Sequence, residues 1–176
     1  MNITEPDLST VIPWATFLTY EFDDQENREC AEEYYLRARK FLESHSFCRR
    51  IKESYIGMCY CKIFGIFLFR VDAEKKYSEW IWAFVGDIPP AILPIKAGSN
   101  AAMALDAYLG EMLDWVEAVD EGRSVEDLLP VNVPPTKEWA DNLRGRLDFI
   151  GNKILLAEYR DQLGYDPDEV EEENEK

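Results

Sequence analysis

Apolar residues recur every three to four positions in three segments of the chain, and this spacing predicts three amphipathic helices. The first covers residues 26–47, with a stripe formed by Cys30, Tyr34, Leu36, Ala38, Phe41 and Leu42. The second runs from residue 101 to about 121, between an N-cap at Ser99 or Asn100 and a stop at Gly122. Its stripe is Ala101, Leu105, Tyr108, Met112, Trp115 and Val119. The third follows a cap at Thr136, with a stripe formed by Trp139, Leu143, Leu147, Ile150 and Ile154.

Between the first two helices the pattern changes to short runs that are almost uncharged and rich in β-branched and aromatic residues, which is typical of strands. In the run 55–71, Gly57 and Gly65 mark a turn, a bulge or a close approach. Residues 80–85, WIWAFV, are apolar on both alternating faces and predict a central strand that is covered on both sides. Residues 91–95 predict a short third strand, which the neighbouring prolines place at a sheet edge.

This order of elements predicts an α+β fold, with a short antiparallel sheet of about three strands packed with three main helices. The helices are expected to lie together on one face of the sheet. A single domain is predicted over residues 26–164. Residues 1–25 are interpreted as an N-terminal arm that packs its aromatic side chains on the core, and residues 165–176 as a disordered acidic tail.

The formal net charge is −16, of which residues 166–176 contribute −6 and the rest of the chain −10. So much negative charge disfavours nucleic acid and anionic membranes as partners and favours a protein with a basic surface. No apolar run reaches the roughly 18 residues that cross a membrane. The first residues lack the pattern of a secretory signal, so a cytoplasmic location is expected.

A dense group of acids on the second helix and just after it forms the most promising surface for a partner. It consists of Glu111, Asp114, Glu117, Asp120, Glu121, Glu126 and Asp127, and is called the acidic face below. The alternative is a solvated helix face without a partner. Asp87 follows a buried strand and a glycine and precedes two prolines, a position that favours a carboxylate that locks the turn over a catalytic one; Asp87 is also included in the partner-binding set.

Other chemically versatile residues are assigned structural roles, with no catalytic residue, cofactor or metal. The cysteines Cys30, Cys48, Cys59 and Cys61 are predicted to be reduced core thiols. Cys59 and Cys61 lie on one face of the predicted strand, so a zinc site shared with one of the others is the alternative. The only histidine, His45, is expected to cap the first helix or lie on the surface. The tryptophans interpreted as core rather than as a stacking platform are Trp80, Trp82, Trp115 and Trp139.

Three stretches resemble a family of small, acidic, uncharacterised bacterial proteins. They are FLFRVD at 67–72, WIWAFVGDIPPAIL at 80–93 and YLGEMLDWVEAVDEGRSVEDLLPVNVPPTKEWADNLRGRLDFI at 108–150. The resemblance covers roughly residues 30–155 and implies a compact cytoplasmic α+β domain.

Small acidic proteins of this type are often antidotes that cover the basic active site of a toxin, and this analogy gives the leading hypothesis. The protein is then an immunity protein that neutralises a toxin or effector by occlusion through its acidic surface. The alternatives are a carboxylate-based enzyme that uses Asp87 with a helix acid, and an inhibitor that mimics nucleic acid.

Overall fold

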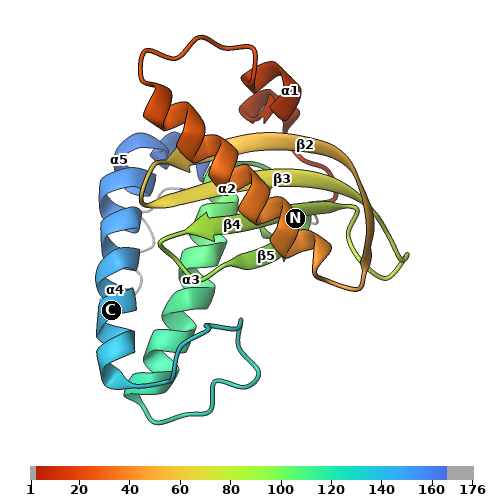
Figure 1. Ribbon diagram of the computed structural model, residues 1–176. Coiled ribbons are helices and arrows are strands. Elements are labelled where there is room, and N and C mark those ends of the chain that lie inside the picture. The colour runs from red at the N-terminus through yellow and green to blue at the C-terminus, as the bar shows by residue number, and fades with distance from the viewer. Residues whose placement is uncertain (1–2, 166–176) are drawn as a thin grey trace.

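The computed structural model describes residues 3–165 and confirms the α+β class (Figure 1). Five strands form one antiparallel sheet in the order β1-β2-β3-β4-β5. The strands are β1 (Ile12–Pro13), β2 (Cys48–Tyr60), β3 (Phe64–Ala73), β4 (Trp80–Gly86) and β5 (Ala91–Pro94). The helices are α1 (Trp14–Phe17), α2 (Gln25–Glu43), α3 (Ala101–Asp120), α4 (Lys137–Ile150) and α5 (Leu156–Glu158). A π-helical turn, Gly151–Leu155, joins α4 to α5, and short 3-10 turns cover Leu8–Thr10, Ile95–Ala97 and Arg160–Gln162.

The long helices cover both faces of the sheet, so the expectation that they lie on one face is wrong. Helix α2 lies across one face, while α3 and α4 pack side by side against the other (Figure 1). The strands show why two apolar layers are needed. Alternate side chains of β3 point to opposite faces, with Ile66 and Leu68 in the core beside α3 and Phe67 and Phe69 in the core beside α2. Strand β4 is buried on both faces, as its sequence predicts.

The predicted count of about three strands is too low by two, because the run 55–71 contains a hairpin and because residues 12–13 of the N-terminal segment form the edge strand β1. The turn of the hairpin lies at residues 61–63, where Lys62 has a left-handed backbone with φ 67°. Strand β2 also begins earlier than predicted, at Cys48. Its first half carries Arg49, Arg50 and Lys52, which conceal a strand from a search for apolar runs.

Gly57 and Gly65 let a helix approach the sheet closely from each side. Gly57 lies at a register shift in β2, and a Cβ atom there would be 2.9 Å from the Cβ of Ala101 in α3. At Gly65 a Cβ atom would be 2.9 Å from Cδ2 of Tyr34 in α2. Two of the three roles considered for these glycines, bulge and close approach, are therefore realised, and the turn lies between them.

The N-terminal segment contributes an edge strand and an aromatic contact. Strand β1 pairs with β2 through Ile12 and Ile56, and the ring of Trp14 stacks on Tyr35 of α2 with centroids 4.1 Å apart. At the other end, the hydroxyl of Tyr165 donates to Asp106, 2.9 Å away. The rest of the predicted acidic tail, residues 166–176, lies outside the described residues.

Side-chain caps fix the starts of the two helices beneath the sheet. The Asn100 side chain accepts a bond from the backbone N–H of Met103 at 2.9 Å and donates one to the carbonyl of Gln162 at 3.0 Å. Thr136 caps α4, and Gly122 follows the end of α3 with φ +67°. Within residues 3–165, no helix is both long and apolar enough to cross a membrane.

Candidate functional site

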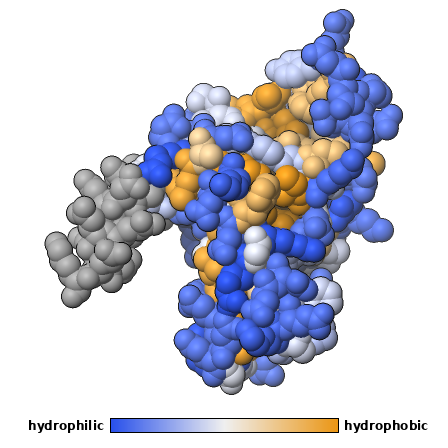
Figure 2. Space-filling view, turned by 90° about the vertical axis from the view of Figure 1, so that its left-hand side faces the viewer, coloured by the Kyte–Doolittle hydropathy of each residue, from blue (hydrophilic) through white to orange (hydrophobic). Residues whose placement is uncertain are grey.

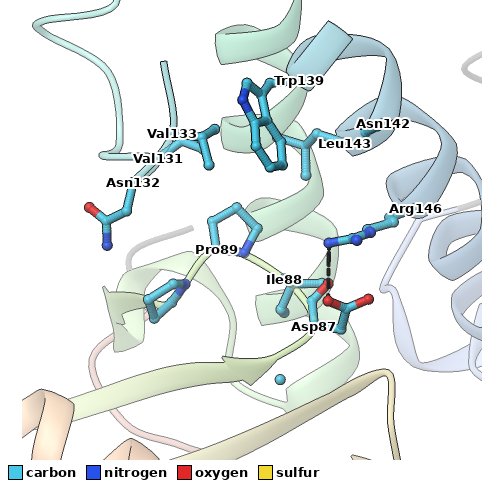
Figure 3. Close-up of a pocket in the computed structure, with 12 residues that line it drawn as sticks. Asp87, Ile88, Pro89, Val131, Asn132, Val133, Trp139, Asn142, Leu143 and Arg146 are labelled. Atoms are coloured by element: carbon cyan, nitrogen blue, oxygen red, sulfur yellow. Dashed lines mark hydrogen bonds and ion pairs between the residues drawn. The ribbon is translucent and has the colours of Figure 1, made fainter. Parts of the chain in front are cut away.

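A pocket of about 220 Å³ opens where the segment after β4 meets α4 (Figure 3). One side is formed by residues 86–90, another by Val131 and Val133 in the segment before α4, and the third by α4 itself. Trp139, Leu143 and Arg146 project from α4 toward the hollow (Figure 3). The fold therefore brings residues 86–90 to one concave surface with residues 131–146, which are distant from them in sequence.

Four hydrogen bonds hold the 86–90 segment in place. The backbone N–H of Asp87 donates to the carbonyl of Ile63 at 2.9 Å, and the buried hydroxyl of Tyr108 donates to the carbonyl of Pro89 at 2.8 Å. Arg37 donates to the carbonyl of Gly86 at 3.1 Å, and Arg146 to that of Asp87 at 3.0 Å. Burial raises the pKa of Tyr108, so its hydroxyl stays a donor at any physiological pH. The pocket wall is thus tied to both layers of helices.

Asp87 forms an ion pair with Arg146, with Oδ1 and Nη1 3.2 Å apart (Figure 3). The two side chains are 64% and 48% exposed, so solvent screens the pair and it adds little stability. Asp87 is the only carboxylate among the described residues that line this pocket. A glycosidase-like mechanism needs two carboxylates at a defined separation. The geometry favours Asp87 as an exposed charge on the rim of an apolar hollow.

Trp139 is 43% exposed, so its assignment to the core is wrong, whereas Trp80, Trp82 and Trp115 are buried as predicted. The buried stripe of α4 includes Ala140, which moves the centre of the stripe roughly 60° away from Trp139. The same search for periodicity placed Leu36 in the core, but its side chain is 63% exposed. Ala140, counted as an apolar position of α4, was the sequence signal that could have placed Trp139 at the edge of the buried stripe.

A second hollow of about 310 Å³ adjoins the first and shares Asp87, Ile88, Asn142 and Arg146 with it. Its far end is formed by Lys62 and Ile63 of the hairpin turn and by Phe149 of α4. Phe149 is 49% exposed. Figure 2 looks onto the side of the molecule that carries α4, and apolar side chains gather near the middle of that view inside a hydrophilic border. Sequence reasoning did not single out Arg146 or Phe149.

The acidic face lies on the solvent side of α3 and on the segment that follows it. All seven acids are exposed. Asp120 pairs with Arg144 of α4, and Glu121 pairs with Arg123 at 2.5 Å. Those with no ion-pair partner within residues 3–165 are Glu111, Asp114, Glu117, Glu126 and Asp127. The ion pair and hydrogen bonds of Asp87 are with Arg146 and Ile63 and involve none of the seven acids, so within the described residues they do not join Asp87 to this face.

Charge is distributed unevenly along the chain. Residues 37–76 hold ten basic and four acidic side chains, a net charge of +6, although the whole chain carries −16. Strand pairing gathers the ends of this segment, because Arg50 lies opposite Asp72 in the sheet and Lys52 pairs with Glu79 at 3.0 Å. This basic end stands on the right in Figure 1, away from the lower ends of α3 and α4. Most of the acids that give the chain its negative net charge therefore lie outside residues 37–76.

The cysteines are free thiols, and three of them lie near one another. Burial raises the pKa of Cys59 to about 12, and a hydrogen bond with Cys30 raises the pKa of Cys61 to about 11. Cys61 lies in the hairpin turn rather than on the strand face predicted for it. No group of three or more histidines, cysteines or acids within residues 3–165 is arranged to hold a metal ion. His45 lies at the end of α2, where its Nδ1 is 2.8 Å from the Phe41 carbonyl.

Comparison with protein-family models, with curated proteins and with solved structures finds no match for this chain. The functional argument therefore depends on the geometry and charge described above.

Proposed function

We propose that this protein is a cytoplasmic protein-binding module, an immunity protein that neutralises a basic toxin or effector by occlusion. The observation that carries the proposal is the set of exposed carboxylates on the acidic face that lack an ion-pair partner within residues 3–165. Like charges at this density repel one another and destabilise the helix that bears them. A cationic partner relieves that repulsion and is attracted over a distance, which raises its rate of association.

Mimicry of nucleic acid is a weaker explanation of the same acids. From Glu111 to Glu121, α3 rises about 15 Å, a length in which B-DNA carries about nine phosphates. The helix offers five acids over that length, and two of them, Asp120 and Glu121, are paired with arginines. The charge density falls well below that of the duplex, so a protein surface with a few separated cations is the better fit.

The test begins with capture of the partner from the source organism and purification of the complex. Association rates are then measured at low and high salt for the wild type and for a variant in which Glu111, Asp114, Glu117 and Glu121 are replaced by Gln or Asn. Helix propensity changes little in these replacements, so folding should be preserved. We expect a roughly tenfold slower association at low salt and a smaller dependence on salt.

A matched control removes the same number of charges elsewhere. Its four amide replacements are at exposed acids away from the acidic face, namely Glu21, Asp23, Glu29 and Asp161. The control should slow association much less, because the decisive charges lie at the contact. Equal slowing by both variants would show that only the net charge matters, and unchanged rates in the first variant would remove the acidic face from the mechanism.

A further inference from the structure

The two hollows beside α4 form one groove, because they share Asp87, Ile88, Asn142 and Arg146. The groove follows the helix from Trp139 to Phe149, ten residues or about 15 Å. Ile88, Leu143 and Ile150 are buried along it and give it an apolar floor. Neither hollow alone is large. At about 220 and 310 Å³ they lie below or at the lower limit of sites that enclose a small-molecule ligand, so they suit single side chains of a larger partner.

The rim of the groove has the composition of an interface anchor. Trp139 and Phe149 are among the large hydrophobic side chains of α4, and each is exposed by more than two fifths. Arg146 stands between them on the same side of the helix. Tryptophan and arginine are the residues most enriched among those that dominate binding energy, and they act at the centre of a contact from which water is excluded. A partner that covers this rim would bury both aromatic rings.

The charges around the groove favour a cationic partner. Glu138 and Asp148 are exposed on the outer side of α4 and have no ion-pair partner within residues 3–165. Asp87 stands at the junction of the hollows with most of its carboxylate open to solvent. The cations at the groove are engaged, since Arg146 pairs with Asp87 and Lys62 with Glu26 at 2.8 Å. The cations that line the groove are therefore neutralised by their partners. The unpaired charges of α4 beside the groove are the carboxylates of Glu138 and Asp148, which favour an incoming lysine or arginine over an acidic segment.

We propose that this groove binds a protein segment in which apolar side chains are flanked by lysine or arginine. An aliphatic side chain enters the hollow beside Trp139, an aromatic or aliphatic side chain enters the hollow beside Phe149, and the flanking cations lie toward Glu138 and Asp148 on the outer side of α4. The inference rests on the proposed function and extends it. The acidic face of α3 attracts the basic partner, while the groove on α4 supplies the apolar contact that slows its dissociation.

The probe is a synthetic peptide, acetyl-Lys-Leu-Lys-Lys-Lys-Phe-Lys-amide, in which the two apolar residues are about 13 Å apart in an extended chain. One comparison peptide has Glu in place of every Lys, and another has Ser in place of Leu and Phe. Binding is followed by two-dimensional NMR of the protein labelled with nitrogen-15. The five tryptophans give five indole N–H signals, and that of Trp139 is assigned with the Trp139→Phe variant.

We expect the basic apolar peptide to shift the Trp139 signal in a saturable manner. The Glu peptide should leave it unchanged, and the Ser peptide should bind at least tenfold more weakly. Trp139→Ala and Phe149→Ala should each weaken binding at least tenfold. Binding to Phe149→Ala is measured through the Trp139 indole signal, and binding to Trp139→Ala through the backbone signals of α4. Leu36→Ala is the matched control, because Leu36 is at least as exposed but lies on α2, across the sheet. It should have no effect.

Several results would overturn the groove and leave the proposed function standing. In the first, the peptide shifts only signals of the acidic face. In the second, the Leu/Phe peptide and the Ser peptide bind with equal affinity. In the third, no saturable shift is seen up to about 5 mM peptide, which would mean a Kd too weak for an anchor. Self-association that is lost in Trp139→Ala would assign the groove to a second copy of the chain, and a preference for oligonucleotide over the basic peptide would assign it to nucleic acid. The four-site amide variant of the acidic face should still bind the peptide at the groove, which separates a failure of one proposal from a failure of the other.

Discussion

Replacement of Gly86 by alanine should destabilise the protein strongly, because this residue sets the path of the chain from β4 into the candidate site. Gly86 has φ +127°, a conformation that residues with a side chain rarely adopt. A Cβ atom there would lie 2.6 Å from the carbonyl oxygen of Ile63 and 2.6 Å from Cα of Phe64. Both are backbone atoms of the neighbouring strand and its turn, so no side-chain rotation can relieve the contact.

The two effects can be added to give an expected magnitude. A residue held in a disfavoured backbone region costs about 1–3 kcal/mol. Overpacking against a rigid neighbour costs about 1–3 kcal/mol more. The free energy of unfolding should therefore fall by about 4 kcal/mol, a large part of the 5–15 kcal/mol typical of a whole domain. The hydrogen bond from the N–H of Asp87 to Ile63 should be disturbed as well.

The same chemical change at Gly110 should have the opposite sign and provides the control. Gly110 is exposed within α3, and a Cβ atom there would meet nothing within 4 Å. Alanine is the better helix former, so Gly110→Ala should stabilise by about 0.5–1 kcal/mol. In urea unfolding with a slope of about 2 kcal/mol per molar, the two variants should differ in midpoint by roughly 2 M. Midpoints within about 0.5 M of each other would refute the reasoning about Gly86.

Three further measurements test other parts of the structure. Tyr108→Phe leaves the carbonyl of Pro89 without its donor and should lower the free energy of unfolding by about 2 kcal/mol in urea. The pKa of the Cys61 thiol is raised to about 11 from the usual 9.0. At pH 8 this thiol should therefore react with an aromatic disulfide reagent about a hundredfold more slowly in the folded protein than in protein unfolded by urea, and Cys30→Ala should increase the rate in the folded protein. Hydrogen bonds from Tyr55 and Arg70 lower the pKa of Glu53 from 4.5. The stabilising contribution of Glu53 is therefore present above pH 4.5 and is lost as the pH falls through the lowered pKa. The thermal unfolding midpoint of Glu53→Gln should vary less with pH in that range than that of the wild type.

The parts of the fold that were predictable are those in which local pattern and tertiary environment agree. Strand β4 is apolar at every position because helices cover both of its sides, and the same observation should have excluded helices on one face only. The first half of β2 was missed because half of its side chains face solvent and carry charge. The extent of α3 followed from its cap at Asn100 and its stop at Gly122, which are local signals.

The candidate site was harder to predict because it is assembled from residues that are remote in sequence. No sequence pattern near Asp87 predicts its ion pair with Arg146. The exposure of Trp139 depends on how far the 131–133 segment extends over α4. An amphipathic pattern reports the direction of the core but says little about the edge of the buried stripe. Side chains at that edge, such as Trp139 and Phe149, are left half-exposed, and these are the ones available for contact.

Net charge alone misrepresents how this protein meets a partner. At physiological ionic strength the Debye length is about 8 Å, so an approaching surface responds to nearby charges rather than to the total of −16. A basic partner is repelled near the start of β2, where Arg49 and Arg50 are exposed and have no ion-pair partner in the described chain. It is attracted where the acids of α3, the 121–127 segment and the outer side of α4 are gathered. The separation of charge therefore orients the partner as well as attracting it, and it directs a cationic surface toward the end of the molecule where the groove beside Trp139 opens.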